Sequence, residues 1–328
     1  MPRASAGKLV VPLVVFGVLA TSCGGAGNEQ QPAGDSLVAA VASYDVVADR
    51  PGRFIVGVYS ADQSRVLAYG TVSFTFSHLG TGEEDAGAFA PAIGPVDAIF
   101  LSIPGQDLDL DTAGPTLVGG SEATGVYGAY DVEFSQAGFW EVAVTAEVDG
   151  RVQETTGAFE VLADSAIPAV GEKAPLTRQP LAGETGVDPK TIDSRASADR
   201  PIPDPVLHDV TIADAIAAGR PVMVVVSTPT FCVSRFCGPI TDSVQDLDAR
   251  FSEDIEFIHL EVWEDFQANK LNPAASEWIA PTPETDGGEP WVFMIDADGV
   301  IVARFDNVAT EAELLAAVQA VLADPAGG

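Results

Sequence analysis

Two cysteines lie in the stretch Ser227-Thr-Pro-Thr-Phe-Cys-Val-Ser-Arg-Phe-Cys-Gly-Pro239, which decides the fold of the C-terminal part of the chain. They are Cys232 and Cys237, and the apolar run Val222 to Val226 directly before this stretch predicts a buried strand. A thiol pair placed where a strand meets a helix indicates disulfide chemistry.

Regular elements alternate around this stretch. After the cysteines, apolar residues recur at the spacing of one helical face: Ile240, Val244, Leu247 and Phe251. Thr310 and Glu313 form a capping box that opens a final helix with Leu314, Val318 and Val321 on one face. The other expected elements are a helix over 211–218, strands over 222–227, 255–262, 291–296 and 300–305, and a partly helical segment over 266–279 that Pro273 limits.

This order of elements, βα, βα, β-hairpin and α, resembles that of a thioredoxin-like domain and covers residues 206–323. Thioredoxins place an aromatic residue and a Cys at a strand-to-helix junction, as Phe231 and Cys232 are placed here. Their second Cys follows after two residues, whereas Cys237 follows after four. The resemblance implies an α/β domain that exchanges thiols and disulfides, with Cys232 as the nucleophile and Cys237 as the resolving thiol.

The position of the cysteines has a physical reason. The unpaired N–H groups at a helix start carry partial positive charge, which stabilises a thiolate, and Arg235 would add to this effect. On a regular helix, residues five apart are rotated by roughly 140° and do not pair easily. Because Pro239 follows soon after Cys237 and proline favours the first helical position, we expect the helix to begin near Pro239, with both cysteines in a loop or loose first turn.

Two further positions bear on the resemblance to thioredoxins. Glu289-Pro290 comes just before the predicted strand, where thioredoxins carry a cis-proline that packs against the disulfide and docks substrate chains, so the resemblance implies a cis bond and a site role for Pro290. Many thioredoxins also place a buried acid six residues before the first Cys. This chain has Val226 there, so proton transfer to the resolving thiol must use another group or water.

Two other functions remain open. Thr228-Pro-Thr-Phe-Cys232-x4-Cys237-Gly238 also resembles the atypical peroxiredoxins, which implies a 2-Cys peroxidase. Those enzymes need Thr or Ser three residues before the Cys, where this chain has Pro229, and an Arg before the later strand, where it has Glu289-Pro290-Trp291. The third reading is a non-enzymatic binding lipoprotein with a static disulfide. A loop this short removes little chain entropy, which favours a redox role over a stabilising one.

Residues 36–162 show a different pattern, in which apolar residues alternate along short runs separated by Gly, Pro, Asn and Asp. The alternating sets are Phe54, Val56 and Val58; Val72, Phe74 and Phe76; Tyr130, Val132 and Phe134; and Trp140, Val142, Val144, Ala146 and Val148. Asp149-Gly150 between two runs predicts a hairpin turn. About seven strands of this kind predict an all-β sandwich of immunoglobulin-like layout, and the chain as a whole is then multidomain.

The remaining segments are irregular or processed. Residues 163–205, rich in Pro, Asp and Ser, predict a linker, and 324–328 a short tail. Residues 1–22 combine Arg3 and Lys8 with an apolar run and end before Cys23, which resembles a bacterial lipoprotein signal. We therefore expect a lipid anchor on Cys23, a tether over 23–35, and an extracytoplasmic, membrane-anchored protein of the cell envelope, where a disulfide persists.

Charge and histidine content restrict the partners. The net charge of −32 argues against nucleic acid, because phosphates would be repelled. The expected partners are protein thiols and disulfides of the envelope. We expect no cofactor and no metal site, because the histidines are only His78, His208 and His259 and no metal-binding spacing occurs. His259, on a predicted strand, is expected in the core or at its rim.

Overall fold

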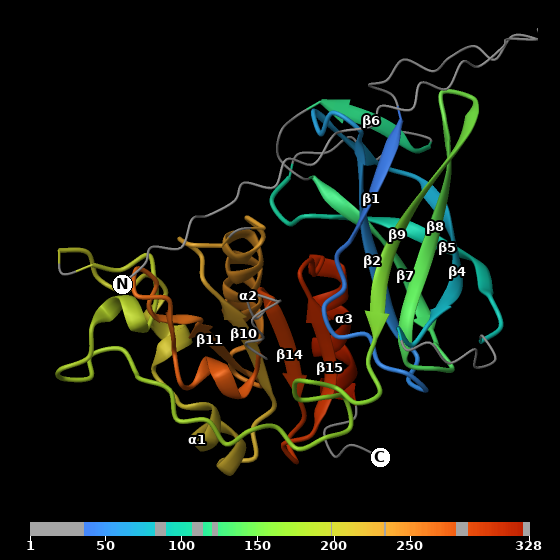
Figure 1. The fold of residues 1–328 in the computed structure, drawn as a ribbon. Coiled ribbons are helices and arrows are strands. Elements are labelled where there is room, and N and C mark those ends of the chain that lie inside the picture. The colour runs from blue at the N-terminus through green and yellow to red at the C-terminus, as the bar shows by residue number, and fades with distance from the viewer. Residues whose placement is uncertain are drawn as a thin grey trace, which may run out of the picture. The chain divides into compact units, whose positions relative to one another are not determined.

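The computed structural model describes residues 36–82, 90–106, 114–119, 124–197, 199–232, 234–279 and 288–323. These residues belong to one compact unit that is rich in β structure and contains two large sheets (Figure 1). Within these ranges, no helix combines the length and the apolar character that crossing a bilayer requires. Cys23 lies outside the described residues, so its predicted role as a lipid anchor stays a prediction.

The first sheet contains nine strands in the order β6-β3-β2-β7-β5-β4-β8-β9, with β1 paired to β2. Its strands are β1 (Leu37–Val41), β2 (Gly52–Ser60), β3 (Arg65–Ala68), β4 (Thr71–Gly80), β5 (Ile93–Ser102), β6 (Thr116–Gly119), β7 (Gly125–Val132), β8 (Gly138–Val148) and β9 (Arg151–Val161). We expected about seven strands; β3 and β6 have four residues each, too few to show alternation. The first part of β5 pairs with β4 and its last part with β7, which makes the sheet continuous.

Period-two burial is confirmed along most of this sheet. All the predicted residues of β4 and β8 are buried, and Asp149 and Gly150 form the two-residue turn between β8 and β9 with φ of 52° and 72°. Tyr130 is an exception, because it is 41% exposed. Asp131 has φ of 54° and the register shifts beside it, so an extra residue turns Tyr130 away from the side of Val132.

The second sheet contains β10 (Val222–Ser227), β11 (Glu256–Glu261), β14 (Trp291–Ile295) and β15 (Ile301–Asp306) in the order β11-β10-β14-β15. Strands β10 and β11 are parallel, and the other two pairs are antiparallel. Apolar residues cover both faces, so β10 is buried along its whole length. One face packs against α2 (Cys237–Phe251) and α3 (Glu311–Ala323), and the other against α1 (Ile212–Ala217) and Trp278.

Most of the local predictions here are confirmed. Ile240, Val244 and Leu247 lie on the buried face of α2, and Leu314, Val318 and Val321 on that of α3. The capping box forms, because the N–H of Thr310 donates to Glu313 Oε2 at 2.8 Å and the N–H of Glu313 donates to Thr310 Oγ1 at 3.2 Å. The segment 266–279, expected to be partly helical, is helical only over the short 3-10 helix η3 (Ala275–Glu277). It also holds β13 (Lys270–Leu271), which pairs with β12 (Trp263–Asp265) and was not predicted.

The segment 163–205 lacks long regular elements, as its composition suggests, but part of it is packed. Its described residues contain one 3-10 helix, η1 (Pro189–Thr191), and a second, η2 (Pro205–His208), begins at its end. Ile192, Asp193 and Ser194 are buried against the second sheet region. Residues assigned to the linker therefore contribute to the core of the C-terminal part. The predicted boundary between linker and domain at residues 205 and 206 stays a prediction.

Charged residues join β2 to the C-terminal elements. Arg53 of β2 lies 3.0 Å from a carboxylate oxygen of Asp306 and 2.9 Å from one of Glu313, and its side chain is 8% exposed. Burial would raise the pKa of Glu313, but the charge of Arg53 and the hydrogen bonds from Thr310 and Tyr130 together outweigh it, so the pKa is lowered. These contacts hold β2 against the end of β15 and the first turn of α3.

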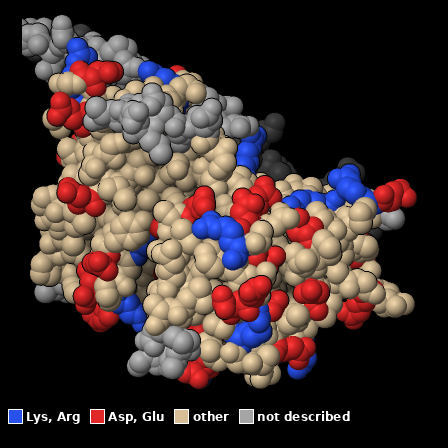
Figure 2. Space-filling model, turned by 180° about the vertical axis from the view of Figure 1, so that it is seen from behind, with Lys and Arg blue, Asp and Glu red and all other residues tan. Residues whose placement is uncertain are grey.

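Acidic residues are otherwise spread over the surface. On the face drawn in Figure 2, Asp and Glu side chains lie in small groups, several of them next to Lys or Arg. This distribution fits a solvated surface better than a single binding patch.

Candidate functional site

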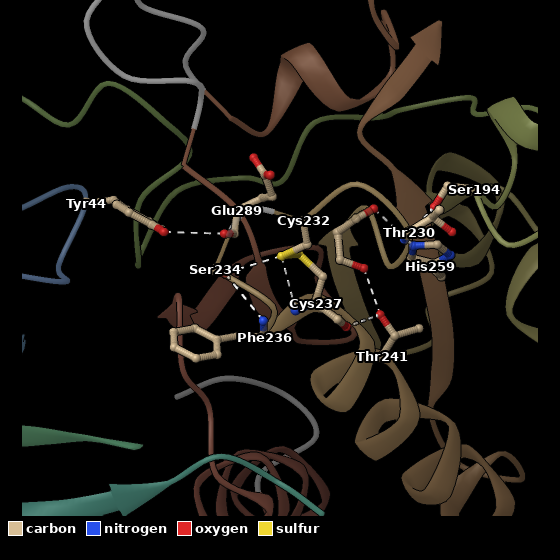
Figure 3. The surroundings of a disulfide bond; sticks show 11 residues. Tyr44, Ser194, Thr230, Cys232, Ser234, Phe236, Cys237, Thr241, His259 and Glu289 are labelled. Carbon is tan, nitrogen blue, oxygen red and sulfur yellow. Dashed lines mark hydrogen bonds between the residues drawn. A yellow bond between two sulfur atoms is a disulfide. The ribbon is translucent and has the colours of Figure 1, made fainter. Parts of the chain in front are cut away.

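Cys232 and Cys237 form a disulfide at the junction of β10 and α2, with their Cα atoms 6.0 Å apart (Figure 3). Cys232 lies in the connecting loop, and Cys237 is the first residue of α2. We expected the helix to begin near Pro239, with both cysteines in a loop or loose first turn; the helix begins two residues earlier, so Cys232 lies in the loop and Cys237 in the first turn. Proline is tolerated at the third helical position because the first N–H groups of a helix have no partner inside it.

The loop that leads from β10 to Cys232 is folded back on itself. The carbonyl of Thr228 accepts from the N–H groups of Phe231, at 3.2 Å, and Cys232, at 3.0 Å. Arg235 has φ of 64°, in the left-handed region, and lies exposed between the two cysteines. This reversal brings cysteines five positions apart close enough to be bonded, which a regular helix would not do.

The sulfur of Cys232 lies against the start of α2. The N–H of Cys237 donates to Cys232 Sγ at 3.4 Å, and the hydroxyl of Ser234 lies 3.3 Å from the same atom. When the disulfide is reduced, both groups are placed to stabilise a thiolate on Cys232, together with the positive end of the helix. Cys237 is fully buried, whereas Cys232 is only half-buried, so Cys232 is the sulfur that a substrate can reach.

Hydrogen bonds fix the start of α2 to the sheet. The hydroxyl of Thr241 donates to the carbonyl of Cys237 at 2.8 Å, and its oxygen lies 2.7 Å from the hydroxyl oxygen of Ser227 at the end of β10 (Figure 3). All three residues are buried. The Cys237 sulfur is therefore held in place, while Cys232 is on the loop.

The peptide bond between Glu289 and Pro290 is cis, as predicted, and Pro290 is buried immediately before β14. The carbonyl of Pro290 accepts from the N–H of Asn307 at 2.8 Å, and the carbonyl of Glu289 accepts from the hydroxyl of Tyr44 at 3.3 Å. A carboxylate oxygen of Glu289 and the two sulfur atoms all lie within 4.8 Å of one another. The resemblance to thioredoxins implies that Pro290 lies at the disulfide, but no pattern in the sequence indicates that the Glu289 carboxylate also points there.

Val226 is completely buried among apolar residues, so no acid occupies the position where many thioredoxins have one. A different buried acid, Glu261, lies at the end of the neighbouring strand β11, in register with Ser227. Burial raises the pKa of Glu261, although His259 and the groups that donate to it oppose the shift. Its Oε2 accepts from the N–H of Ser194 at 2.7 Å, and Ser194 Oγ accepts from the N–H of Thr230 in the cysteine loop at 3.1 Å.

The histidines are distributed unevenly. His208 and His259 meet beside Asp193, all three buried, whereas His78 lies in β4 against Trp140. The expectation that His259 lies in the core is confirmed, but the sequence analysis missed its two neighbours. One signal was available: His259 and Glu261 alternate on one face of β11, a strand whose other face is apolar.

Aromatic side chains flank the loop next to Cys232. The ring of Phe231 stacks on that of Phe266 with centroids 4.2 Å apart and planes 3° apart, and Trp263 packs against Phe266 edge-on at 5.5 Å. Phe266 is 38% exposed. This group gives the half-buried cysteine an apolar surface beside it.

Searches for a matching protein family and for similar curated proteins find none. The geometry of the disulfide and its surroundings is therefore the evidence for the function.

The different exposure of the two sulfurs predicts different reactivity. After reduction, Cys232 should be alkylated by iodoacetamide at least about tenfold faster than Cys237, a difference of about 1.4 kcal/mol in activation free energy. Peptide mass spectrometry of timed samples measures both rates. Ser234→Ala should slow the alkylation of Cys232, whereas Ser276→Ala, on the exposed η3, should not. Equal rates at the two cysteines would contradict this description of the site.

Proposed function

We propose that the protein is a thiol–disulfide oxidoreductase with a thioredoxin-like domain over residues 206–323. The observation that carries this proposal is the contact of Cys232 Sγ with the N–H of Cys237 at the first residue of α2. It supplies a half-buried sulfur with a thiolate-stabilising environment, and a buried partner sulfur already bonded to it. This combination suits reversible disulfide exchange better than a purely structural crosslink.

The arrangement of the second sheet supports the thioredoxin-like assignment. Only β10 and β11 are parallel, β14 and β15 follow as an antiparallel pair, and α2 leaves the end of β10 at the disulfide (Figure 1). Glu289-Pro290 stands directly before β14. For residues 36–162 we retain an immunoglobulin-like sandwich as a proposal. The strands form one continuous sheet, but Phe54 of β2 packs edge-on against Phe74 and Phe76 of β4, which is not its neighbour in the strand order, so two parts of this sheet face each other.

Reduction of a substrate would proceed in two exchanges. The Cys232 thiolate attacks one sulfur of a substrate disulfide, which forms a mixed disulfide and releases the other substrate sulfur as a thiolate. The Cys237 thiolate then attacks Cys232 Sγ, which restores the Cys232–Cys237 bond and releases the second substrate sulfur. Two electrons pass from the cysteine pair to the substrate, and oxidation of a substrate dithiol is the reverse sequence.

Glu289 is our proposed proton acceptor for the second exchange. Cys237 is fully buried, so its thiol needs a nearby base to become a thiolate. With Val226 in the usual position of the acid, the carboxylate grouped with both sulfurs among the described residues is that of Glu289. It would take the proton as Cys237 attacks and return it when the pair is reduced.

The aromatic group of Phe231, Trp263 and Phe266 lies beside Cys232 and is our proposed contact for the apolar part of a protein substrate. The lipoprotein-like residues 1–23 support an extracytoplasmic, membrane-anchored location, where client thiols and disulfides of the envelope are available.

A trapping experiment tests the reaction. In Cys237→Ser, the mixed disulfide on Cys232 cannot be resolved, so a substrate disulfide should remain covalently attached; Cys232→Ser should form no adduct. Intact-mass spectrometry after incubation with oxidised glutathione and with a disulfide-containing peptide detects the adduct. Absence of an adduct from Cys237→Ser would favour a static disulfide. Hydrogen peroxide should oxidise reduced wild type no faster than free cysteine; a much faster reaction would favour a peroxidase.

The role of Glu289 is tested by separating the two exchanges. Glu289→Gln should slow resolution of the mixed disulfide by about 100-fold at neutral pH, the contribution expected of a positioned base, and should leave the first attack nearly unchanged. Stopped-flow mixing of the reduced protein with an aromatic disulfide resolves the two steps. Glu311→Gln, on the exposed start of α3, is the matched control. Equal resolution rates in the wild type and Glu289→Gln would remove Glu289 from the mechanism.

A further inference from the structure

Three potential metal-ligand atoms converge between the segment before α1 and strand β11. His259 Nδ1 lies 3.4 Å from His208 Nε2 and 3.6 Å from Asp193 Oδ2, and His208 Nε2 lies 3.7 Å from the same carboxylate oxygen. The three residues are at most 1% exposed. They come from different elements: Asp193 follows η1, His208 ends η2, and His259 is in the middle of β11.

The hydrogen bonding of His259 directs a lone pair at this point. Its Nε2 lies 3.2 Å from the carbonyl oxygen of Ser227, which only accepts, so Nε2 carries a ring hydrogen. In the tautomer with its single hydrogen there, His259 Nδ1 is an acceptor, and it faces Asp193 Oδ2, which is also an acceptor. A backbone carbonyl that fixes the second ring nitrogen is the usual support for a histidine that binds a metal.

Hydrogen bonds account poorly for the positions of these three ligand atoms. A single hydrogen on His208 Nε2 would have to serve both the 3.4 Å and the 3.7 Å contacts, and the latter exceeds hydrogen-bonding distance. Atoms separated by 3.4, 3.6 and 3.7 Å all lie about 2.1 Å from the centre of their triangle, within the range of about 2.0–2.2 Å for bonds from nitrogen and oxygen to zinc.

The surrounding charges are compatible with a cation. Asp193 supplies one negative charge, and its Oδ1 also accepts from the N–H of Arg195 at 2.8 Å. Arg195 Nη2 donates to Asp193 Oδ2, the proposed ligand atom, at 2.7 Å and lies 2.9 Å from a carboxylate oxygen of Asp204. Arg195 Nη1 lies 3.5 Å from one of Asp242, so two further carboxylates offset the charge of the guanidinium.

We propose that Asp193, His208 and His259 bind one divalent transition-metal ion of the zinc class. Two imidazole nitrogens and one carboxylate oxygen suit this class, and His208 would bind through Nε2 as the neutral tautomer that carries its ring hydrogen on Nδ1. The ion would hold the segment of Asp193 against β11. Ser194, the next residue, accepts from the N–H of Thr230, so the site also supports the loop that carries Cys232. This site does not depend on the redox function.

Metal binding by the oxidised full chain, without a polyhistidine tag, tests the proposal. After removal of metals by chelation, equilibrium dialysis against Zn²⁺ and mass spectrometry of the metal content should find about one ion per chain, with a raised unfolding temperature. His208→Asn and His259→Gln should each weaken Zn²⁺ binding by roughly 100-fold or more, because each removes a ligand. Even the loss of a group that only supports a ligand lowers metal affinity by about 10- to 100-fold. His78→Asn is the matched control and should bind as the wild type does.

A second measurement separates this site from the cysteines and does not require the histidine variants to fold. The double variant Cys232→Ser, Cys237→Ser should still bind one Zn²⁺, and Co²⁺ bound to the wild type should show no thiolate-to-metal charge-transfer band. The proposal is overturned if the wild type binds no more than a substoichiometric trace of Zn²⁺. It is also overturned if Zn²⁺ binding is lost in the double cysteine variant, or if Zn²⁺ binding persists in a folded His208→Asn protein.

Discussion

The contact between the N–H of Cys237 and the sulfur of Cys232 is the interaction on which the functional site depends. It exists because α2 begins at Cys237, two residues earlier than the position of Pro239 suggests, and because the left-handed Arg235 turns the loop back toward the helix. A regular helix through both cysteines would place their side chains on different faces. The longer spacing between the cysteines is therefore accommodated by a loop, and the helix start remains available to a thiolate.

The surrounding structure gives the two sulfurs unequal freedom. Thr241 and Ser227 hold the first turn of α2 on the end of β10, so Cys237 is part of the core. Cys232 is attached only through a loop whose conformation depends on Thr228 and Ser194. This inequality assigns the roles of attacking and resolving thiol. The proposed metal site lies next to Ser194, so an ion bound there would also stabilise the loop that carries Cys232.

Features that depend on residues close together in the chain could be predicted from the sequence. The apolar run before the cysteines, the capping box of Thr310 and Glu313, and the Asp149-Gly150 turn are formed by neighbouring residues, and each is found in the structure. Tyr130 was misplaced because a single extra residue changes the face, and nothing in the alternation signals it. Glu289 and Asp193 were missed because their partners are distant in sequence. Only the alternation of His259 and Glu261 in a buried strand hinted at a polar site.

The equilibrium between this disulfide and glutathione tests the central claim most directly. A thiolate stabilised by the helix start and by Ser234 favours the reduced pair, so the reduction potential should lie above about −300 mV, in the range of catalytic rather than structural disulfides. The fraction of reduced protein, measured by mass after acid quenching and alkylation across a series of glutathione ratios, gives this potential. A potential below about −300 mV, or a disulfide that glutathione and dithiothreitol cannot reduce in the folded chain, would contradict a redox role for Cys232 and Cys237.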